Sequence, residues 1–180
     1  MEENEIKIGT QTWTSKNLDV ETYRNGDEIP QVKDKKEWTN LTTGAWCYYE
    51  NKGENGTTYG KLYNWYAVND PRGLAPKGYH IPTDAEWTIL NEGLGVADVP
   101  FIKADEAGNN TSGFAGLPGG SRDSYGNFYY VGVFGYWWSS SEDGTYYAWD
   151  SDGDLSSGAG FAPSYFDNEQ NGFSVRCLRD

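Results

Sequence analysis

Of all the residues in this sequence, three alternating aspartates have the spacing that best fits the binding of a metal ion. Asp150, Asp152 and Asp154 alternate with small residues, which lets a loop wrap carboxylate oxygens around Ca²⁺. An EF-hand loop starting at the first aspartate also needs glycine at its sixth position and glutamate at its twelfth, where this chain has Leu155 and Phe161. We therefore expect a solvated acidic loop and no metal or other cofactor, with Ca²⁺ binding as the alternative.

Groups suited to catalysis are few. The single histidine, His80, precedes a predicted helix, and we interpret it as structural. The serine run 139–141 has neither a Gly-x-Ser-x-Gly turn nor a second histidine beside it. The Pro-Gly-Gly run 118–120 lacks the Lys-Ser/Thr of a phosphate loop. We predict no catalytic residues and no enzymatic activity.

The C-terminal part of the chain mixes aromatic with small polar residues. Tyr and Trp give a large contact area at low entropic cost, and Ser, Gly and Asn give adaptable hydrogen bonds, as in antibody paratopes. Flat rings also suit the C–H faces of sugars, whose hydroxyls can bond to Asp and Asn. For Tyr147 and Trp149, which alternate within a predicted strand, a place in the core is equally favoured. We predict ligand binding by Tyr146, Asp150, Ser151, Asp152, Asp154, Phe161, Tyr165, Asp167 and Asn168.

Composition excludes several classes of protein. The 180 residues carry a formal net charge of −13, which would repel phosphate, so we predict no nucleic-acid partner. No apolar run is long enough to cross a membrane, so we predict no membrane insertion, and the N-terminal residues do not form a signal peptide. Mean hydropathy is −0.77, yet 16% of residues are aromatic, which makes a compact core feasible. The composition leaves the oligomeric state open.

The predicted elements follow an α+β order in one domain, residues 1–180. Short strands are predicted by alternation and by flanking glycines over 6–14, 44–50, 114–120, 126–133, 136–141, 145–149 and 172–178. A helix is predicted over 59–68, where Leu62, Trp65 and Tyr66 share a face. A second begins after Thr83, which forms a capping box with Glu86. Residues 24–40 and 51–56 are predicted to be turns and loops, and 150–171 a long loop.

A series of ordered motifs covers nearly the whole chain, from about Ile6 to Asp180. They lie at 8–13, 15–18, 59–68, 73–87, 112–122, 136–142 and 172–180. Together they resemble the Fibrobacter succinogenes major paralogous domain family. The resemblance implies a C-type lectin-like fold of the formylglycine-generating-enzyme type. That fold would have two helices, short, mostly antiparallel strands and long C-terminal loops.

The chain departs from the chemistry of related folds. Ca²⁺-dependent lectins of this type carry Glu-Pro-Asn or Gln-Pro-Asp and a Trp-Asn-Asp strand. Neither tripeptide occurs here, and the corresponding strand is Trp-Ser-Ser at 138–140. Family members carry further cysteines near positions 55 and 75 that this chain lacks. The resemblance therefore implies that Cys47 and Cys177 are unpaired, with a direct disulfide between them as the alternative.

The resemblance also implies a biological setting. Similar domains occur in bacterial surface proteins, in phage tail or receptor-binding proteins, and as variable proteins of diversity-generating retroelements. We expect a ligand-binding module that displays a variable surface, about residues 141–171, to a cell-surface protein or glycan. Its location would be a virion, a phage tail or a cell surface. The alternatives are a bacterial cell-surface adhesin or glycan-binding domain, and a degenerate formylglycine-generating-enzyme relative.

Overall fold

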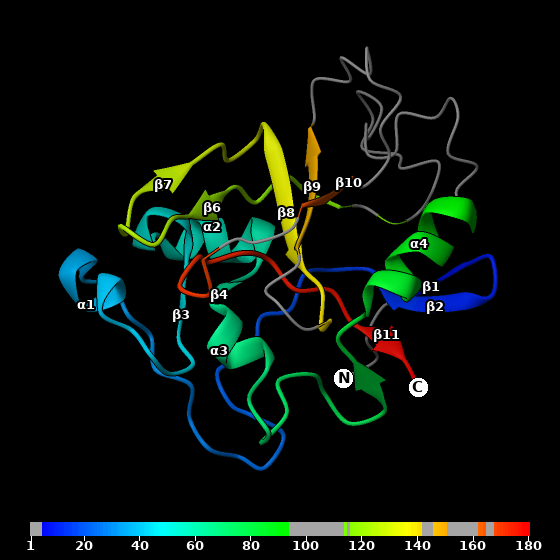
Figure 1. Ribbon diagram of the computed structural model, residues 1–180, viewed down its shortest axis with the longest axis horizontal. Coiled ribbons are helices and arrows are strands. Elements are labelled where there is room, and N and C mark those ends of the chain that lie inside the picture. The colour runs from blue at the N-terminus through cyan, green and yellow to red at the C-terminus, as the bar shows by residue number, and fades with distance from the viewer. Residues whose placement is uncertain (1–4, 94–113, 115, 142–145, 151–161, 165–167) are drawn as a thin grey trace.

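The computed structural model describes residues 5–93, 114, 116–141, 146–150, 162–164 and 168–180 (Figure 1). The helices in these residues are α1 (Lys35–Thr39), α2 (Gly53–Tyr59), α3 (Trp65–Val68) and α4 (Asp84–Gly93), with a 3₁₀ turn, η1, at Tyr49–Asn51. The strands are β1 (Glu5–Ile8), β2 (Gln11–Thr14), β3 (Trp46–Cys47), β4 (Leu62–Tyr63), β5 (Tyr79–His80), β6 (Ser121–Arg122), β7 (Phe128–Tyr129), β8 (Phe134–Trp138), β9 (Tyr146–Asp150), β10 (Ala162–Ser164) and β11 (Leu178–Arg179).

The strands form several small antiparallel sheets. One sheet has the order β1-β2-β11-β5, and Leu178 of β11 pairs with both Trp13 and His80. Figure 1 shows β11, at the C-terminus, beside the β1–β2 hairpin. A second sheet has the order β10-β9-β8, and β3–β4 and β6–β7 form two-stranded sheets. The chain therefore mixes α and β structure, with few helices and short strands.

The single strand predicted over 6–14 is wrong, because the segment is a hairpin. β1 and β2 pair antiparallel, with Ile8 opposite Gln11 and Ile6 opposite Trp13. Gly9, between them, has a φ of 56°, which glycine adopts without steric cost. Alternation continues through both strands, so it carries no signal of the reversal.

The helix predicted over 59–68 is also wrong. Gly60 has a φ of 76° and ends α2, and its N–H donates to the carbonyl of Gly56 at 2.9 Å. Leu62 and Tyr63 then form β4, which pairs with β3, before α3 starts at Trp65. The apolar residues of this segment have the spacing of a helix, but they belong to a buried strand followed by a short helix.

Two helical segments lie where loops were predicted. α1 begins after Asp34, whose side chain accepts a hydrogen bond of 2.8 Å from the N–H of Glu37. α2 begins at Gly53, inside the predicted loop 51–56. The resemblance implied two helices, whereas the described residues form four.

The capping box predicted for α4 is confirmed. The backbone N–H and the hydroxyl of Thr83 both donate to the Glu86 carboxylate at 2.8 Å. The other carboxylate oxygen of Glu86 lies 2.9 Å from Nε2 of His80, and Nδ1 of His80 lies 2.8 Å from Asp180. His80 therefore links the start of α4 to the C-terminus, which agrees with its structural interpretation.

The core is filled with aromatic rings, as the composition predicted. Its largest fully buried side chains include Trp13, Trp38, Trp87, Trp137 and Trp138. The rings of Trp13 and Trp87 lie 5.0 Å apart, so the inner face of α4 packs on β2. Such tilted contacts between rings are favourable beyond the area that they bury.

Two arginines are buried in this core and bind backbone carbonyls. Arg122 donates to the carbonyl of Val32 at 2.7 Å and to those of Lys33 and Asp34, and its guanidinium lies 4.3 Å from the ring centroid of Trp38. Arg176 donates to the carbonyls of Thr14 and Phe114 at 2.7 and 2.8 Å. These bonds tie segments far apart in the sequence to one framework.

Cys47 and Cys177 are both buried and form no disulfide with each other, as the resemblance implied. Burial raises the pKa of the Cys47 thiol to about 12, despite the nearby guanidinium of Arg122. A buried thiol held in its protonated form is a poor nucleophile. Among the described residues, no helix combines the length and the apolar character needed to cross a bilayer.

Candidate ligand-binding site

Most of the nine predicted binding residues lie outside the described residues. These are Ser151, Asp152, Asp154, Phe161, Tyr165 and Asp167. Tyr146 and Asp150 begin and end β9, opposite Trp138 and Phe134 of β8. Within the described part of the chain, no group of three or more His, Cys, Asp or Glu residues could hold a metal ion.

Asn168 is the predicted residue whose side chain can be described. It is exposed, as predicted, and its Oδ1 accepts a hydrogen bond of 3.0 Å from the N–H of Gln170. Its carbonyl accepts another from Asn171 at 2.7 Å. The side chain therefore closes a turn that presents Glu169.

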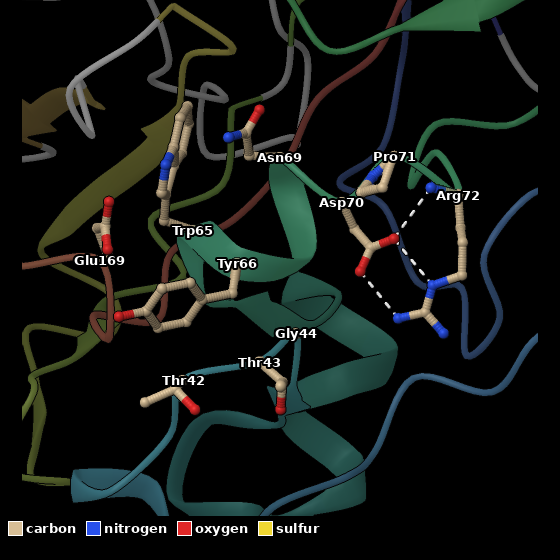
Figure 2. Close-up of a pocket in the computed structure, with 10 residues that line it drawn as sticks. All are labelled: Thr42, Thr43, Gly44, Trp65, Tyr66, Asn69, Asp70, Pro71, Arg72 and Glu169. Carbon is tan, nitrogen blue, oxygen red and sulfur yellow. Dashed lines mark hydrogen bonds and ion pairs between the residues drawn. The ribbon is translucent and has the colours of Figure 1, made fainter.

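Glu169 borders a hollow of about 270 Å³ beside α3 (Figure 2). Figure 2 shows its lining from several segments, with the ring of Tyr66 directed toward Glu169 and the Asp70–Arg72 pair on the other side. The lining residues are Thr42, Thr43, Gly44, Trp65, Tyr66, Asn69, Asp70, Pro71, Arg72 and Glu169. The hollow thus meets the C-terminal end of the predicted display region, 141–171.

Asn64 joins two walls of the hollow. It is fully buried and caps α3, because its Oδ1 accepts from the N–H of Ala67 at 3.1 Å. The same oxygen accepts from the N–H of Ala45, and its Nδ2 donates to the carbonyl of Thr43, both at 2.9 Å. One side chain therefore fixes the 42–45 segment against α3.

The turn at 168–170 is fixed to the same walls. The N–H of Trp65 donates to the Glu169 carbonyl at 2.9 Å. The Gln170 amide donates to the carbonyls of Thr39 and Leu41 at 3.1 and 2.9 Å. The backbone at Glu169 is therefore held on both sides, while its carboxylate is exposed.

An ion pair forms the opposite wall. Arg72 contacts Asp70 through two side-chain bonds of 2.8 Å, from Nε and Nη2, and reaches Asp27 at 3.2 Å. These bonds hold the pKa of Asp70 below its ordinary value. The guanidinium lies 4.0 Å from the ring centroid of Tyr23, a buried side chain whose pKa is raised to about 12 by burial first and then by Asp70.

The ring of Tyr66 is half-buried. Partial burial raises the pKa of its hydroxyl, and the neighbouring Glu169 carboxylate raises it further. The hydroxyl is therefore protonated. Trp65, next in the chain, is only 4% exposed and packs on Trp138 at 5.6 Å between ring centroids. Of the two rings, Tyr66 is the one that a ligand can reach.

The lining combines hydroxyl, amide and carboxylate groups with an aromatic ring. Thr42, Thr43 and Asn69 present exposed hydroxyl and amide groups, and Asp70 and Glu169 present carboxylates around one ring. Such a set can hydrogen-bond a polar ligand and stack against its apolar face.

The model of one protein family, described as the Fibrobacter succinogenes major domain, matches residues 6–179. The chain belongs to this family. Apart from Glu5, the first residue of β1, the match spans the described helices and strands and the residues that line the hollow, and it agrees with the resemblance carried by the motifs. Neither the curated proteins nor the solved structures give a match to this member of the Fibrobacter succinogenes major domain family.

Sequence reasoning missed most residues of the hollow. The spacing places Tyr66 on one face of a predicted helix, and it predicts no binding role for Asp70, Arg72 or residues 42–44. The one local signal was the polar run 69–72 directly after an aromatic segment. Nothing local indicated that 42–44 and Glu169 would meet it.

Proposed function

We propose that this chain is a C-type lectin-like recognition module that binds a cell-surface ligand through the 141–171 region and the adjoining hollow. The observation that carries the proposal is that the polar groups fall into two sets, those buried in the framework and those exposed around the hollow. Buried Arg122 and Asn64 bind protein backbone, whereas the polar groups around the hollow are largely exposed. A framework closed in this way leaves the adjoining surface available for ligands.

Two settings suit such a module. The first is a phage receptor-binding or retroelement-diversified protein, in which the 141–171 sequence varies on a constant framework. It requires a nearby, nearly identical DNA repeat that differs at adenines, beside a reverse transcriptase gene. The second is a bacterial surface adhesin or glycan-binding domain, which the sugar-compatible lining of the hollow favours. It requires an export signal encoded in the native gene.

Binding to whole bacterial cells and to a glycan array tests the proposal. The triple variant Asp150→Ala, Phe161→Ala, Tyr165→Ala should lower the apparent affinity at least about tenfold, a loss of about 1.4 kcal/mol. The control is Glu28→Ala with Tyr125→Ala, which removes an exposed carboxylate and an exposed ring elsewhere. Equal binding by the wild type and the triple variant would place the site elsewhere. Loss of wild-type binding in EDTA would indicate Ca²⁺.

A further inference from the structure

We infer that the hollow beside α3 is a subsite for one neutral sugar ring. The inference rests on the proposed function, because it names the ligand class of the surface described above. The volume of the hollow, about 270 Å³, lies just below the volume of pockets that bind drug-sized ligands, which is about 300 Å³ and more. The space therefore suits a single ring better than a peptide or an oligosaccharide.

The hollow is built before any ligand arrives. The three hydrogen bonds of Asn64 fix the 42–45 segment, and Gly44 lets that segment approach closely. A Cβ at Gly44 would lie 1.9 Å from the Tyr23 hydroxyl and 2.9 Å from Cα of Ala67, so the close approach requires glycine. A preformed site avoids part of the ordering cost of binding.

The lining offers both hydrogen-bond donors and acceptors. The Thr42 and Thr43 hydroxyls can donate or accept, and the Asn69 amide does both. The carboxylates of Asp70 and Glu169 accept. Each hydroxyl of a sugar also donates and accepts, so this mixed set matches vicinal hydroxyls.

Tyr66 provides the flat surface that a sugar ring requires. Figure 2 shows its hydroxyl directed toward Glu169, and the ring is half-buried in the wall of the hollow. The C–H groups of a pyranose can lie on its exposed face while the ring hydroxyls reach the polar rim. Figure 2 shows this ring between the Thr42 side and the Trp65 side of the hollow.

Charge selects neutral sugars over acidic ones. Among the described residues that line the hollow, two are carboxylates and one is a cation, Arg72, which is shared between Asp70 and Asp27. A sialic or uronic acid would add a negative charge to this site in a chain of net charge −13. An ammonium ligand would use the carboxylates and the ring but not the donors of Thr42, Thr43 and Asn69.

Titration of the ¹⁵N-labelled chain, in EDTA, with simple sugars followed by NMR tests the inference. Glucose, galactose, mannose and N-acetylglucosamine are the neutral probes, glucosamine is the cationic probe, and glucuronate is the anionic probe. At least one neutral sugar should shift the amide resonances of Tyr66 and Asn69, and glucuronate should not. Shifts caused only by glucosamine, or by no neutral sugar, would overturn the inference.

Variants then locate the contact. Tyr66→Ala and Asn69→Ala should each weaken the binding of that sugar, Tyr66→Ala by at least tenfold, while Tyr125→Ala, at an exposed tyrosine outside the hollow, should leave it unchanged. Asn69 is exposed, so its variant tests the site without disturbing the fold. A further outcome is that the chain binds whole cells in a way that depends on Asp150, Phe161 and Tyr165 and yet binds none of the sugars. That result would refute the sugar subsite and leave the proposed recognition module standing.

Discussion

Arg122 is buried in the core, whereas Arg72 lies at the surface beside the hollow. This contrast separates two regions of the molecule, the framework and the surface around the hollow. Arg122 is 1% exposed and donates to backbone carbonyls of residues 32–34. Arg72 lies at the rim of the hollow and binds the side chains of Asp70 and Asp27. The first arrangement joins chain segments, and the second shapes a surface. We therefore expect the stability of the fold and the proposed recognition to depend on different residues.

The largest effect is expected in the framework. Arg122→Ala should lower the free energy of unfolding by about 3 kcal/mol or more, because it leaves buried carbonyls unpaired and a void beside Trp38. Arg122→Lys should recover only part of this loss, since an ammonium lacks the planar array of donors. Urea denaturation followed by circular dichroism measures both.

The control for Arg122 is Arg179→Ala, which removes an arginine whose side chain is 60% exposed. It should change the free energy of unfolding by less than about 1 kcal/mol. Similar losses in Arg122→Ala and Arg179→Ala would contradict the division into framework and surface.

An intermediate effect is expected where the two regions join. Asn64→Ala should cost about 2 kcal/mol, because α3 loses its cap and the buried N–H of Ala45 loses its acceptor. It should also shift the NMR resonances of Tyr66, since the wall of the hollow is released. The matched control is Asn69→Ala, also an asparagine, for which we expect a change within about 0.5 kcal/mol. Equal losses would show that the hollow is not held by Asn64.

The smallest effect concerns pH. Burial alone would lower the pKa of His80, but its bonds to Asp180 and Glu86 outweigh burial and raise the pKa above its ordinary value. The protonated imidazole therefore stabilises the fold fully below the unfolded-state pKa of about 6.5, and this contribution is lost as the pH rises through the folded-state pKa. For a partly exposed group we expect less than about 1 kcal/mol.

The measurement is the free energy of unfolding of the wild type and of His80→Gln between pH 6 and 8. The wild type should lose stability relative to the variant as the pH rises. A constant difference across this range would show that the proton on His80 makes no contribution.

The predictions from sequence succeeded where the determinants are local. The capping box of Thr83 and Glu86 needs only residues three apart on one helix turn, so it was visible in the sequence. The hairpin at Gly9 and the helix end at Gly60 were missed because both depend on a positive φ, which a hydrophobic pattern does not report.

The hollow could not be predicted, because it is assembled from segments far apart in the chain. Residues 42–44, α3, the 69–72 run and Glu169 meet through Asn64 and Gln170. Composition showed that the C-terminal region is polar and aromatic, but it gave no means of finding the partners that Glu169 would meet.

The sequence by itself determined the family, the aromatic composition of the core and the start of α4, because ordered motifs, ring content and capping are properties of the chain. Tertiary structure decided which aromatic rings are exposed and which are buried. Trp65 and Tyr66 are neighbours in sequence, yet Trp65 is buried against Trp138 and Tyr66 lines the hollow. The exposure of a ring depends on what distant segments pack against it, and only the folded chain brings those segments together.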